Sequence, residues 1–550
     1  MLDDFQNLPL TSMIATGDIP PHFILDPDVS FGYHYFSLLF AAQLMHIADV
    51  YVWTALDLAR GLGFTLGLML SALFVQRVTG SRLAGLAGGM MTAFAGGTRW
   101  LLLLFPEGLL QKLGADLQMI GSGAHTAPDL VAAMTSQWAA TGMGPFPFPF
   151  AFINGFNPAG VITYHAGAGG LTTLIAALLL LLHNKWKGWR AWLVMTALLA
   201  SAGLANEVQL AEICVGVVLV LLVFLLVRRS WRFPVSLWRW AAVAFAAGLI
   251  ALFQGGVLTS LVQDRLISIL PGSPAAASAY HTFQFSLFWP PKVLSSHLGY
   301  LSLTDPAQLL LALVEIGPIL LVTPLVLAWM VKALRYQRWY ECMLVCAGTA
   351  SLGLFVVELS GPAGLTALTR AQSLFIGVLQ TFAVPSLWLW ARRRSDKIKA
   401  WCGAFLAVSI YGGLVLFGFS LIAAARPVAS DFLTLTDIKM TALYWDQLEE
   451  DALVFDTETS RSPVIFGRPS NAAYDWFNRK PEWLALRENP DPAALRAAGY
   501  RYLYLDDQYW QSLTEEQKAA LQAPCVKVVH EETLFFPSEM RRLLEVSECR

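Results

Sequence analysis

Long apolar runs constrain this chain more than any other feature of its sequence. A helix needs about 20 apolar residues to cross a bilayer, and about ten runs between residues 56 and 425 approach that length. Only 14% of the residues are charged, whereas a soluble protein has roughly 25%. The chain is therefore expected to be an integral membrane protein. The expected spans are Leu56–Gln76, Leu83–Leu104, Gly167–Leu182, Ala191–Leu204, Leu210–Val227, Ala241–Leu261, Leu309–Val331, Cys342–Val357, Gln372–Trp390 and Trp401–Ala424.

Basic residues predict the orientation of these spans, because cytoplasmic loops are enriched in lysine and arginine. Every odd-numbered connection is short and basic, whereas the even-numbered ones are poorer in basic residues and two of them are long. The basic connections contain Arg77 and Arg82; Lys185, Lys187 and Arg190; Arg228, Arg229 and Arg232; Lys332, Arg335 and Arg338; Arg392, Arg393, Arg394, Lys397 and Lys399. The alternation places the N-terminal residues, the long loops and the C-terminal tail outside the cytoplasm, across what we expect to be a bacterial plasma membrane.

Residues 1–55 form the first of three expected domains, an extracytoplasmic acidic loop followed by an interfacial helix. The loop opens with Asp3 and Asp4 and is polar and short. The segment Tyr33–Val52 is apolar enough to be a span, but counting it as one would invert every basic loop downstream. We therefore predict a helix that lies on the outer interface, with an eleventh span as the alternative.

Residues 426–550 differ from the transmembrane domain of residues 56–425 in their pattern of apolar and polar residues. Asp451–Asp456 and Tyr500–Asp506 are typical of strands. Asp491–Ala498 and Leu513–Gln522 are typical of helices; Ser512 to Glu515 is close to a capping box, and Gly499 is a natural stop. The fold class is therefore a polytopic α-helical membrane protein of about ten transmembrane helices, with a small extracytoplasmic α/β domain at its C-terminus.

Cysteine placement predicts one disulfide. Cys525 and Cys549 are the only cysteines of the polar tail and are expected to pair if the tail faces an oxidising compartment. The remaining cysteines lie in apolar segments, where packing is their expected role: Cys214, Cys342, Cys346 and Cys402. No spacing resembles a zinc site. The sequence thus indicates no metal, although a divalent metal cofactor stays open.

The charge balance excludes one class of partner. A formal net charge of −2 gives no electrostatic case for nucleic acid, which would require a basic patch or stripe. Membrane lipids are the partners that the composition implies.

The candidate catalytic groups are Asp3 and Asp4, a pair of adjacent carboxylates ahead of a membrane domain. A reaction on a lipid-linked substrate needs an acid or base at the water boundary. The alternative is a solvated acidic terminus. Neighbouring polar residues favour the functional interpretation; they are Asp18, His22, Asp26, Asp28 and His34.

Ionisable residues at membrane depth form a second set of candidates. Arginine pairs with phosphate in a bidentate manner, so Arg99 and Arg370 are natural ligands of a lipid phosphate. Mutual ion pairs, such as Arg99 with Glu207, are the alternative. Further candidates are Glu207, Glu212, Glu315 and His165.

This layout resembles the GT-C superfamily of integral-membrane glycosyltransferases. Asp3-Asp4 is similar to the acidic motif of that family's first outer loop, Thr16-Gly17-Asp18-Ile19-Pro20 to the turn that follows it, and Tyr33 to Asp49 to its juxtamembrane helix. The resemblance implies a polyprenyl-phosphate-linked sugar donor, a glycan, lipid or protein acceptor, inverting transfer, and Asp3 or Asp4 as general base. The family has a transmembrane helix before the acidic loop and none precedes Asp3 here, so we expect either an upstream start or a chain without that helix.

Two rival functions stay open. The first is a transporter or flippase-like protein, which broken helices at the bilayer midplane and an internal repeat would favour. We expect neither, and the long outer loops with an outer domain favour an enzyme. The second is a non-catalytic relative that binds a lipid-linked glycan.

Overall fold

The computed structural model describes residues 4–117, 127–135, 137–139, 145–150, 168–183, 188–229, 232–260, 262–263, 284–287, 289–295, 298–360, 367–424, 433–535 and 538–549. The chain divides into two compact units. The first contains Met1–Leu2, Arg60–Phe253 and Thr282–Pro427, and the second contains Asp3–Ala59, Gln254–His281 and Val428–Arg550. We call them the helical unit and the mixed unit. Asp3–Ala59 thus belongs to the same unit as the C-terminal segment Val428–Arg550.

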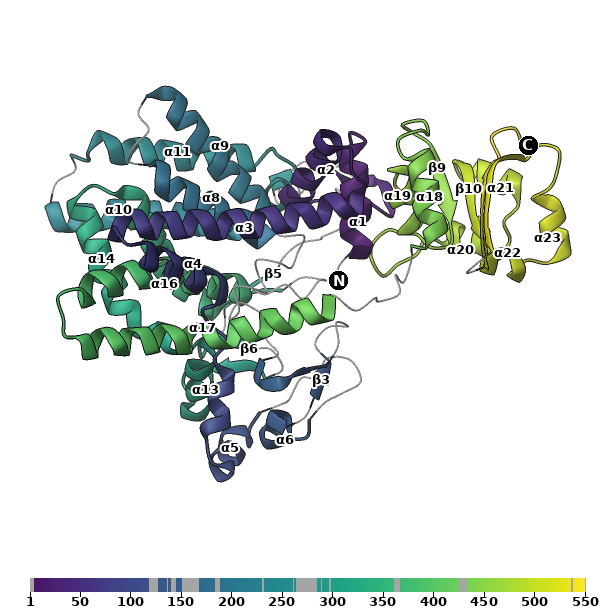
Figure 1. Cartoon of the computed structure of the whole chain (residues 1–550). Coiled ribbons are helices and arrows are strands. Elements are labelled where there is room, and N and C mark those ends of the chain that lie inside the picture. The colour runs from purple at the N-terminus through teal and green to yellow at the C-terminus, as the bar shows by residue number, and fades with distance from the viewer. Residues whose placement is uncertain are drawn as a thin grey trace. The chain divides into compact units, whose positions relative to one another are not determined.

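The helical unit is built almost entirely of helices (Figure 1). Its α-helices are most of α3 (Val52–Thr79), α4 (Arg82–Phe94), α5 (Glu107–Gly114), α6 (Leu130–Thr135), α8 (Ala168–Leu182), α9 (Trp189–Ala205), α10 (Glu207–Arg228), α11 (Val235–Ala251), α13 (Pro306–Ile316), α14 (Thr323–Arg335), α15 (Trp339–Ser351), α16 (Ala367–Ala391) and α17 (Asp396–Ala424). Its 3-10 helices are η1 (Arg99–Leu104), η2 (Phe148–Phe150), η4 (Pro318–Val322) and η5 (Leu352–Val356). Among the described residues, three two-stranded pairs accompany them: β3 (Gln137–Ala139) with β4 (Pro145–Pro147), β5 (Gln284–Leu287) with β8 (Val357–Ser360), and β6 (Lys292–Ser295) with β7 (Gly299–Ser302).

Five helical segments of the described chain are long and apolar enough to cross a membrane. They are Val52–Thr79, Gln209–Val227, Pro318–Arg335, Leu374–Ala391 and Asp396–Phe419. The shorter apolar helices are Phe36–Ala48, Gly169–Leu182, Trp189–Ala205, Val235–Ala251 and Pro306–Ile316. The polytopic helical architecture agrees with the sequence prediction, but several of the expected spans are shorter than the apolar runs that predicted them.

The predicted spans Leu83–Leu104 and Leu309–Val331 are interrupted at glycines. The run Leu83–Leu104 forms α4 only as far as Phe94; Gly96 and Gly97 then adopt positive φ values of 115° and 66°, and a short 3-10 helix follows. The run Leu309–Val331 is likewise broken at Gly317, whose φ is 87°. Glycine adopts these conformations at little cost, whereas other residues do not. The predictions of continuous spans at Leu83–Leu104 and Leu309–Val331 are therefore wrong.

A three-layer α/β domain lies in the mixed unit (Figure 1). Its sheet has the order β11-β12-β10-β9, in which β9 and β10 are parallel and the other neighbours are antiparallel. The strands are β9 (Leu453–Asp456), β10 (Tyr500–Asp506), β11 (Lys527–Phe535) and β12 (Ser538–Glu545). The helices are α18 (Leu435–Tyr444), α19 (Arg461–Phe466), α20 (Pro481–Glu488), α21 (Pro492–Ala497), α22 (Asp507–Ser512) and α23 (Glu515–Ala520).

Strand β10 shows why both faces of this sheet are covered. Leu503 and Leu505 join a core with Trp483 and other residues of the helices that follow β9. Tyr502 and Tyr504 alternate with them and join a second core on the opposite face, with residues of α18 and α19. Successive side chains of a strand point to opposite faces, so each strand residue has a helix to pack against.

The sequence predicted only part of this domain. The structure has β9, β10, α21 and α23 close to the expected positions, and Gly499 has a φ of 90° after α21. The capping box is formed by Thr514 and Gln517 rather than by Ser512 and Glu515. The hairpin of β11 and β12 was not predicted.

The N-terminal part of the mixed unit is helical rather than a loop. Helix α1 (Asp4–Ala15) is followed by the short strands β1 (His22–Phe23) and β2 (Asp26–Ser30) and by α2 (Phe36–Ala48). Apolar side chains after the polar opening explain the helix, because Leu10, Met13 and Ile14 are buried at helical spacing. Tyr33–Val52 contains α2 as a helix of 13 residues, which is about 20 Å long and too short to span a bilayer.

Candidate functional site

An aspartate and a histidine pair directly after α1. Gly17 turns the chain with a φ of 106°, and Asp18 follows. Its Oδ2 accepts a hydrogen bond from the backbone N–H of His22 at 2.8 Å, and its Oδ1 lies 2.5 Å from His22 Nδ1. The histidine side chain is 48% exposed and the aspartate 19%. The carboxylate thus holds the imidazole in one orientation while the ring stays accessible.

The segment that carries this pair is fixed to the C-terminal α/β domain. The hydroxyl of Ser12 donates to Val464 O at 2.9 Å, and the hydroxyl of Thr16 donates to Gly467 O at 2.8 Å. Farther along, Lys480 Nζ lies 2.7 Å from a carboxylate oxygen of Asp26, with both side chains largely buried. These contacts surround Asp18 in sequence and hold it on a rigid support, which a reactive group requires.

This geometry is suited to proton transfer. In the tautomer that carries its proton on Nδ1, His22 donates that proton to Asp18 and leaves Nε2 as an accessible proton acceptor. A base oriented by a neighbouring carboxylate is the arrangement that activates hydroxyl groups in many enzymes.

The other candidates from the N-terminal segment lie as follows. Asp3 is outside the described residues, and Asp4 begins α1 with a side chain that is also outside them. The imidazole ring of His34 lies against the ring of Tyr33, with centroids 3.7 Å apart. Asp28 is exposed and its N–H donates to Asp26 Oδ1 at 3.1 Å.

A second polar site lies in the helical unit, where the two helix breaks meet. The N–H of Thr98 donates to Glu315 O at 3.2 Å, and its hydroxyl donates to Val314 O. Arg99 Nε donates to Glu315 Oε1 at 2.6 Å, and both side chains are fully buried. The arginine thus has a partner, but it is Glu315 rather than Glu207.

The remaining guanidinium nitrogens of Arg99 are also used. Nη1 donates to Phe148 O at 3.1 Å, Nη2 donates to Ser295 Oγ at 3.4 Å, and the guanidinium lies 4.2 Å from the Phe148 ring centroid. At the same break, Gln380 Nε2 donates to Ala95 O at 2.6 Å. Side chains from distant elements therefore form hydrogen bonds with backbone groups that the interrupted helices leave without a helical partner.

The other membrane-depth candidates lie as follows. Glu207 is buried at the start of α10. Glu212, one turn farther along, is buried, and neither of its carboxylate oxygens has a hydrogen-bond partner among the described residues. Arg370 belongs to α16 with its side chain outside the described residues, and His165 lies outside them.

In the part of the chain that the structure describes, no group of three or more His, Cys, Asp or Glu side chains could hold a metal ion.

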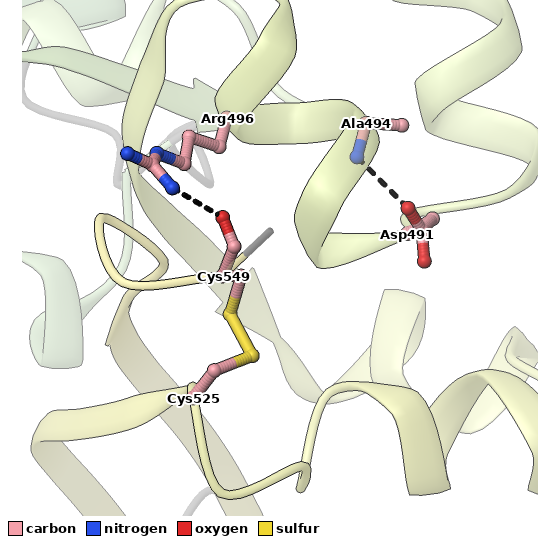
Figure 2. The surroundings of a disulfide bond; sticks show 5 residues. All are labelled: Asp491, Ala494, Arg496, Cys525 and Cys549. Atoms are coloured by element: carbon pink, nitrogen blue, oxygen red, sulfur yellow. Dashed lines mark hydrogen bonds between the residues drawn. A yellow bond between two sulfur atoms is a disulfide. The ribbon is translucent and has the colours of Figure 1, made fainter.

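The two cysteines of the polar tail cross-link the C-terminal domain. Cys525 and Cys549 form a disulfide with Cα atoms 5.0 Å apart, and Arg496 Nη1 donates to Cys549 O at 2.7 Å (Figure 2).

Sequence reasoning missed two features of these sites. His22 was recognised only as a neighbour of the acidic residues, although its spacing of four from Asp18 in the turn Gly17-Asp18-Ile19-Pro20-Pro21-His22 could have suggested the pair. The helix breaks were missed although Gly96-Gly97 and Gly317-Pro318 are recognised turn and loop dipeptides.

Comparison with known proteins identifies no family. No protein-family model matches the chain, and no curated protein matches it. Among solved structures, a crystal structure of the oligosaccharyltransferase of Archaeoglobus fulgidus with zinc and sulfate is similar, with a TM-score of 0.39 and 11% identity over 92% of this chain. The similarity covers 64% of that oligosaccharyltransferase chain.

Proposed function

We propose that the chain is a membrane glycosyltransferase that moves a sugar from a polyprenyl-phosphate-linked donor to an acceptor hydroxyl on the extracytoplasmic face. The observation that carries the proposal is the accessible Asp18–His22 pair, fixed on a unit from which the apolar helix α3 begins. The membrane-length helices and the sequence resemblance to GT-C enzymes support it. The acceptor is a glycan, a lipid or a protein.

The proposed chemistry needs a base for one proton. As the acceptor oxygen attacks the anomeric carbon of the sugar, its proton passes to the base, the bond from that carbon to the phosphate oxygen breaks, and its electrons stay on the phosphate. The base is either a carboxylate of Asp3 or Asp4 or the imidazole of His22. Arg370 is the proposed partner of the leaving phosphate, because Arg99 is already paired with Glu315.

Three variants test the assignment of the base. Asp3→Asn, Asp4→Asn and His22→Gln are compared with Asp28→Asn, which removes an exposed carboxylate from the same segment. Loss of the base should lower sugar transfer at least about a hundredfold while donor binding persists. Transfer at the parent rate in all three variants would refute a base in this segment, and failure of the parent chain to transfer sugar from any polyprenyl-phosphate donor would refute the function itself.

A second function is favoured by a specific observation. Transporters bind substrates where discontinuous helices meet, and the two interrupted helices meet at the Arg99–Glu315 pair. A flippase would move the lipid-linked sugar across a proteoliposome membrane with the sugar–phosphate bond intact, whereas a glycosyltransferase would cleave it. Following a donor labelled in both sugar and phosphate therefore separates the two functions.

A further inference from the structure

A hydrogen-bonded turn in the mixed unit exposes two aromatic side chains. Asp475 Oδ1 accepts hydrogen bonds from the N–H groups of Phe477 and Asn478, both at 2.7 Å, and its Oδ2 accepts from Asn478 Nδ2 at 2.7 Å. The N–H of Tyr474 closes the turn by donating to Asn478 O at 2.9 Å. The turn nevertheless leaves Tyr474 52% and Phe477 78% exposed.

The N-terminal segment packs against Trp476, which lies between Tyr474 and Phe477 in the turn. The ring of Trp476 packs edge-on against Phe23, with centroids 4.8 Å apart, and against Phe5, with centroids 5.8 Å apart. Phe5 is itself 47% exposed. We call Phe5, Tyr474, Trp476 and Phe477 the aromatic patch. Two stretches of chain that are far apart in sequence build it, so it is held in place by the tertiary structure rather than by a flexible loop.

Exposure of such side chains to water is unfavourable. Burial of a large apolar side chain stabilises a protein relative to its exposure, yet Phe477 stays exposed on this hydrogen-bonded turn. Contiguous exposed apolar side chains mark sites that contact another protein or a membrane.

The same unit contains the start of a membrane-length helix. Helix α3 is a 28-residue apolar helix, and its first eight residues, Val52–Ala59, belong to the mixed unit, where Val52, Ala55 and Leu56 are buried. Just before and within its first turn, Tyr51 and Trp53 stack with centroids 5.1 Å apart. Tyrosine and tryptophan are enriched where a protein meets the headgroups of a bilayer. The mixed unit is therefore tethered at the membrane surface by the start of a span.

We propose that the aromatic patch inserts into the headgroup layer of the bilayer, on the side where α3 begins. Its side chains bury their apolar surface at the boundary of the acyl chains, while the Tyr474 hydroxyl and the Trp476 indole nitrogen stay at the polar level. The patch is thus a second membrane contact of the mixed unit, in addition to α3. This inference is independent of whether the chain transfers or transports sugars.

A nitroxide label at the turn tests the contact in the full chain. Phe477→p-acetylphenylalanine keeps an aromatic ring and accepts a nitroxide without any change to the cysteines. Power-saturation measurements in lipid nanodiscs compare collisions with oxygen, which partitions into lipid, and with a nickel chelate, which stays in water. The matched control is Val528→p-acetylphenylalanine on β11, an apolar residue of the same unit that is 58% exposed.

The inserted patch predicts a loss of nickel collisions at position 477 with oxygen collisions retained, whereas position 528 collides freely with nickel. Equal nickel access at both positions would overturn the proposal. Protection of position 477 from oxygen and nickel alike would also overturn it, because it would mean that protein covers the patch. A label at Tyr474→p-acetylphenylalanine repeats the measurement, and retention of the Cys525–Cys549 disulfide verifies that each variant is folded.

Discussion

Asp437 shows how one buried carboxylate is stabilised in the α/β domain. It is fully buried, and it accepts hydrogen bonds from Arg541 Nε at 2.8 Å, from Arg541 Nη2 at 3.2 Å and from the Tyr504 hydroxyl at 2.7 Å. Burial alone would raise the pKa of Asp437, but the hydrogen bonds from Arg541 and the charges of Arg461 and Arg541 outweigh burial and lower it below the ordinary value of 3.8. The pKa of Arg541 is raised by the same contacts, so both partners favour the ion pair.

We expect this carboxylate to make the domain acid-labile. The unfolded chain binds the proton of Asp437 near pH 3.8, whereas the folded chain binds it only at lower pH. Between these values the unfolded state holds more protons, so the stability that is present above pH 3.8 is lost as the pH falls toward the folded pKa.

Asp437→Asn isolates this contribution. Thermal unfolding of the full chain in detergent is followed by near-ultraviolet circular dichroism. At about pH 6 the variant should be less stable than the parent by about 3 kcal/mol, because the buried Arg541 and Arg461 lose the charge of Asp437. The difference should shrink toward about pH 3. A difference that is constant with pH would contradict the ionised state of Asp437.

The residue types indicated that ionisable groups at membrane depth are candidate site residues, but they did not show which of these groups pair with each other. Arg99 was expected to bind a phosphate or to pair with Glu207, and its partner is Glu315, 216 positions away in sequence. No local pattern links residues at such a separation. The Asp18–His22 pair has a separation of four, and this local spacing is the kind of information that a sequence does contain.

At the scale of elements, hydropathy predicted the apolar helices but hid their interruptions. Averaging over a window of span length makes Leu309–Val331 one run, whereas Gly317 ends α13 and Pro318 begins η4. A glycine with positive φ and a proline without an N–H remove helical hydrogen bonds, but two such residues lower the mean hydropathy of a span-length window only slightly. Turn dipeptides therefore indicate helix ends that a hydropathy average over a span-length window does not show.

One glycine fixes the contact between α1 and α19. Gly467 ends α19 with a φ of 68°, and a Cβ there would collide with the side chain of Thr16. Gly499 has a similar φ of 90°, but a Cβ there would meet only Leu453 Cδ1 at 3.7 Å.

Comparison of Gly467→Ala with Gly499→Ala should therefore separate backbone strain from steric conflict. Both substitutions cost about 1–2 kcal/mol for the left-handed conformation, but only Gly467→Ala displaces Thr16. Amide hydrogen exchange of α1 should accelerate in Gly467→Ala and stay at the parent rate in Gly499→Ala. Equal exchange of α1 in both variants would show that this glycine does not hold the N-terminal segment.

At the scale of the whole molecule, the sequence predicted a helical membrane domain followed by a small α/β domain. It did not predict that Asp3–Ala59 and Val428–Arg550 share one unit. Their union depends on contacts such as Ser470 N–H to Ile24 O, at 2.8 Å, which join segments more than four hundred residues apart. The alternation of apolar and polar residues defines elements, whereas the grouping of elements depends on which surfaces fit together.

The disulfide is expected to contribute to the stability of this unit and to report its compartment. Closing a loop of 24 residues should stabilise the domain by about 3 kcal/mol. Reductant should therefore lower the unfolding temperature of the parent and leave that of Cys525→Ser unchanged, with Cys402→Ser behaving like the parent. The same disulfide reports the compartment of the domain. Alkylation of the protein after denaturation without reductant should modify four of the six cysteines. If all six cysteines are modified in protein taken directly from membranes, the domain lies in a reducing compartment.

The last prediction concerns the orientation of the chain. Basic connections place Arg335 and Lys397 in the cytoplasm, and the same alternation places Asp28 and Glu515 outside. Cysteines introduced at Asp28 and Glu515 should react with a membrane-impermeant maleimide in intact cells, whereas those at Arg335 and Lys397 should react only after the membrane is opened. Helix α2 has 13 residues and is too short to cross the bilayer between Asp28 and α3. The contrary outcome is that Asp28→Cys reacts only after the membrane is opened, while Glu515→Cys reacts in intact cells. The chain would then cross the membrane between Asp28 and α3 in spite of the length of α2. The Asp18–His22 pair would lie in the cytoplasm.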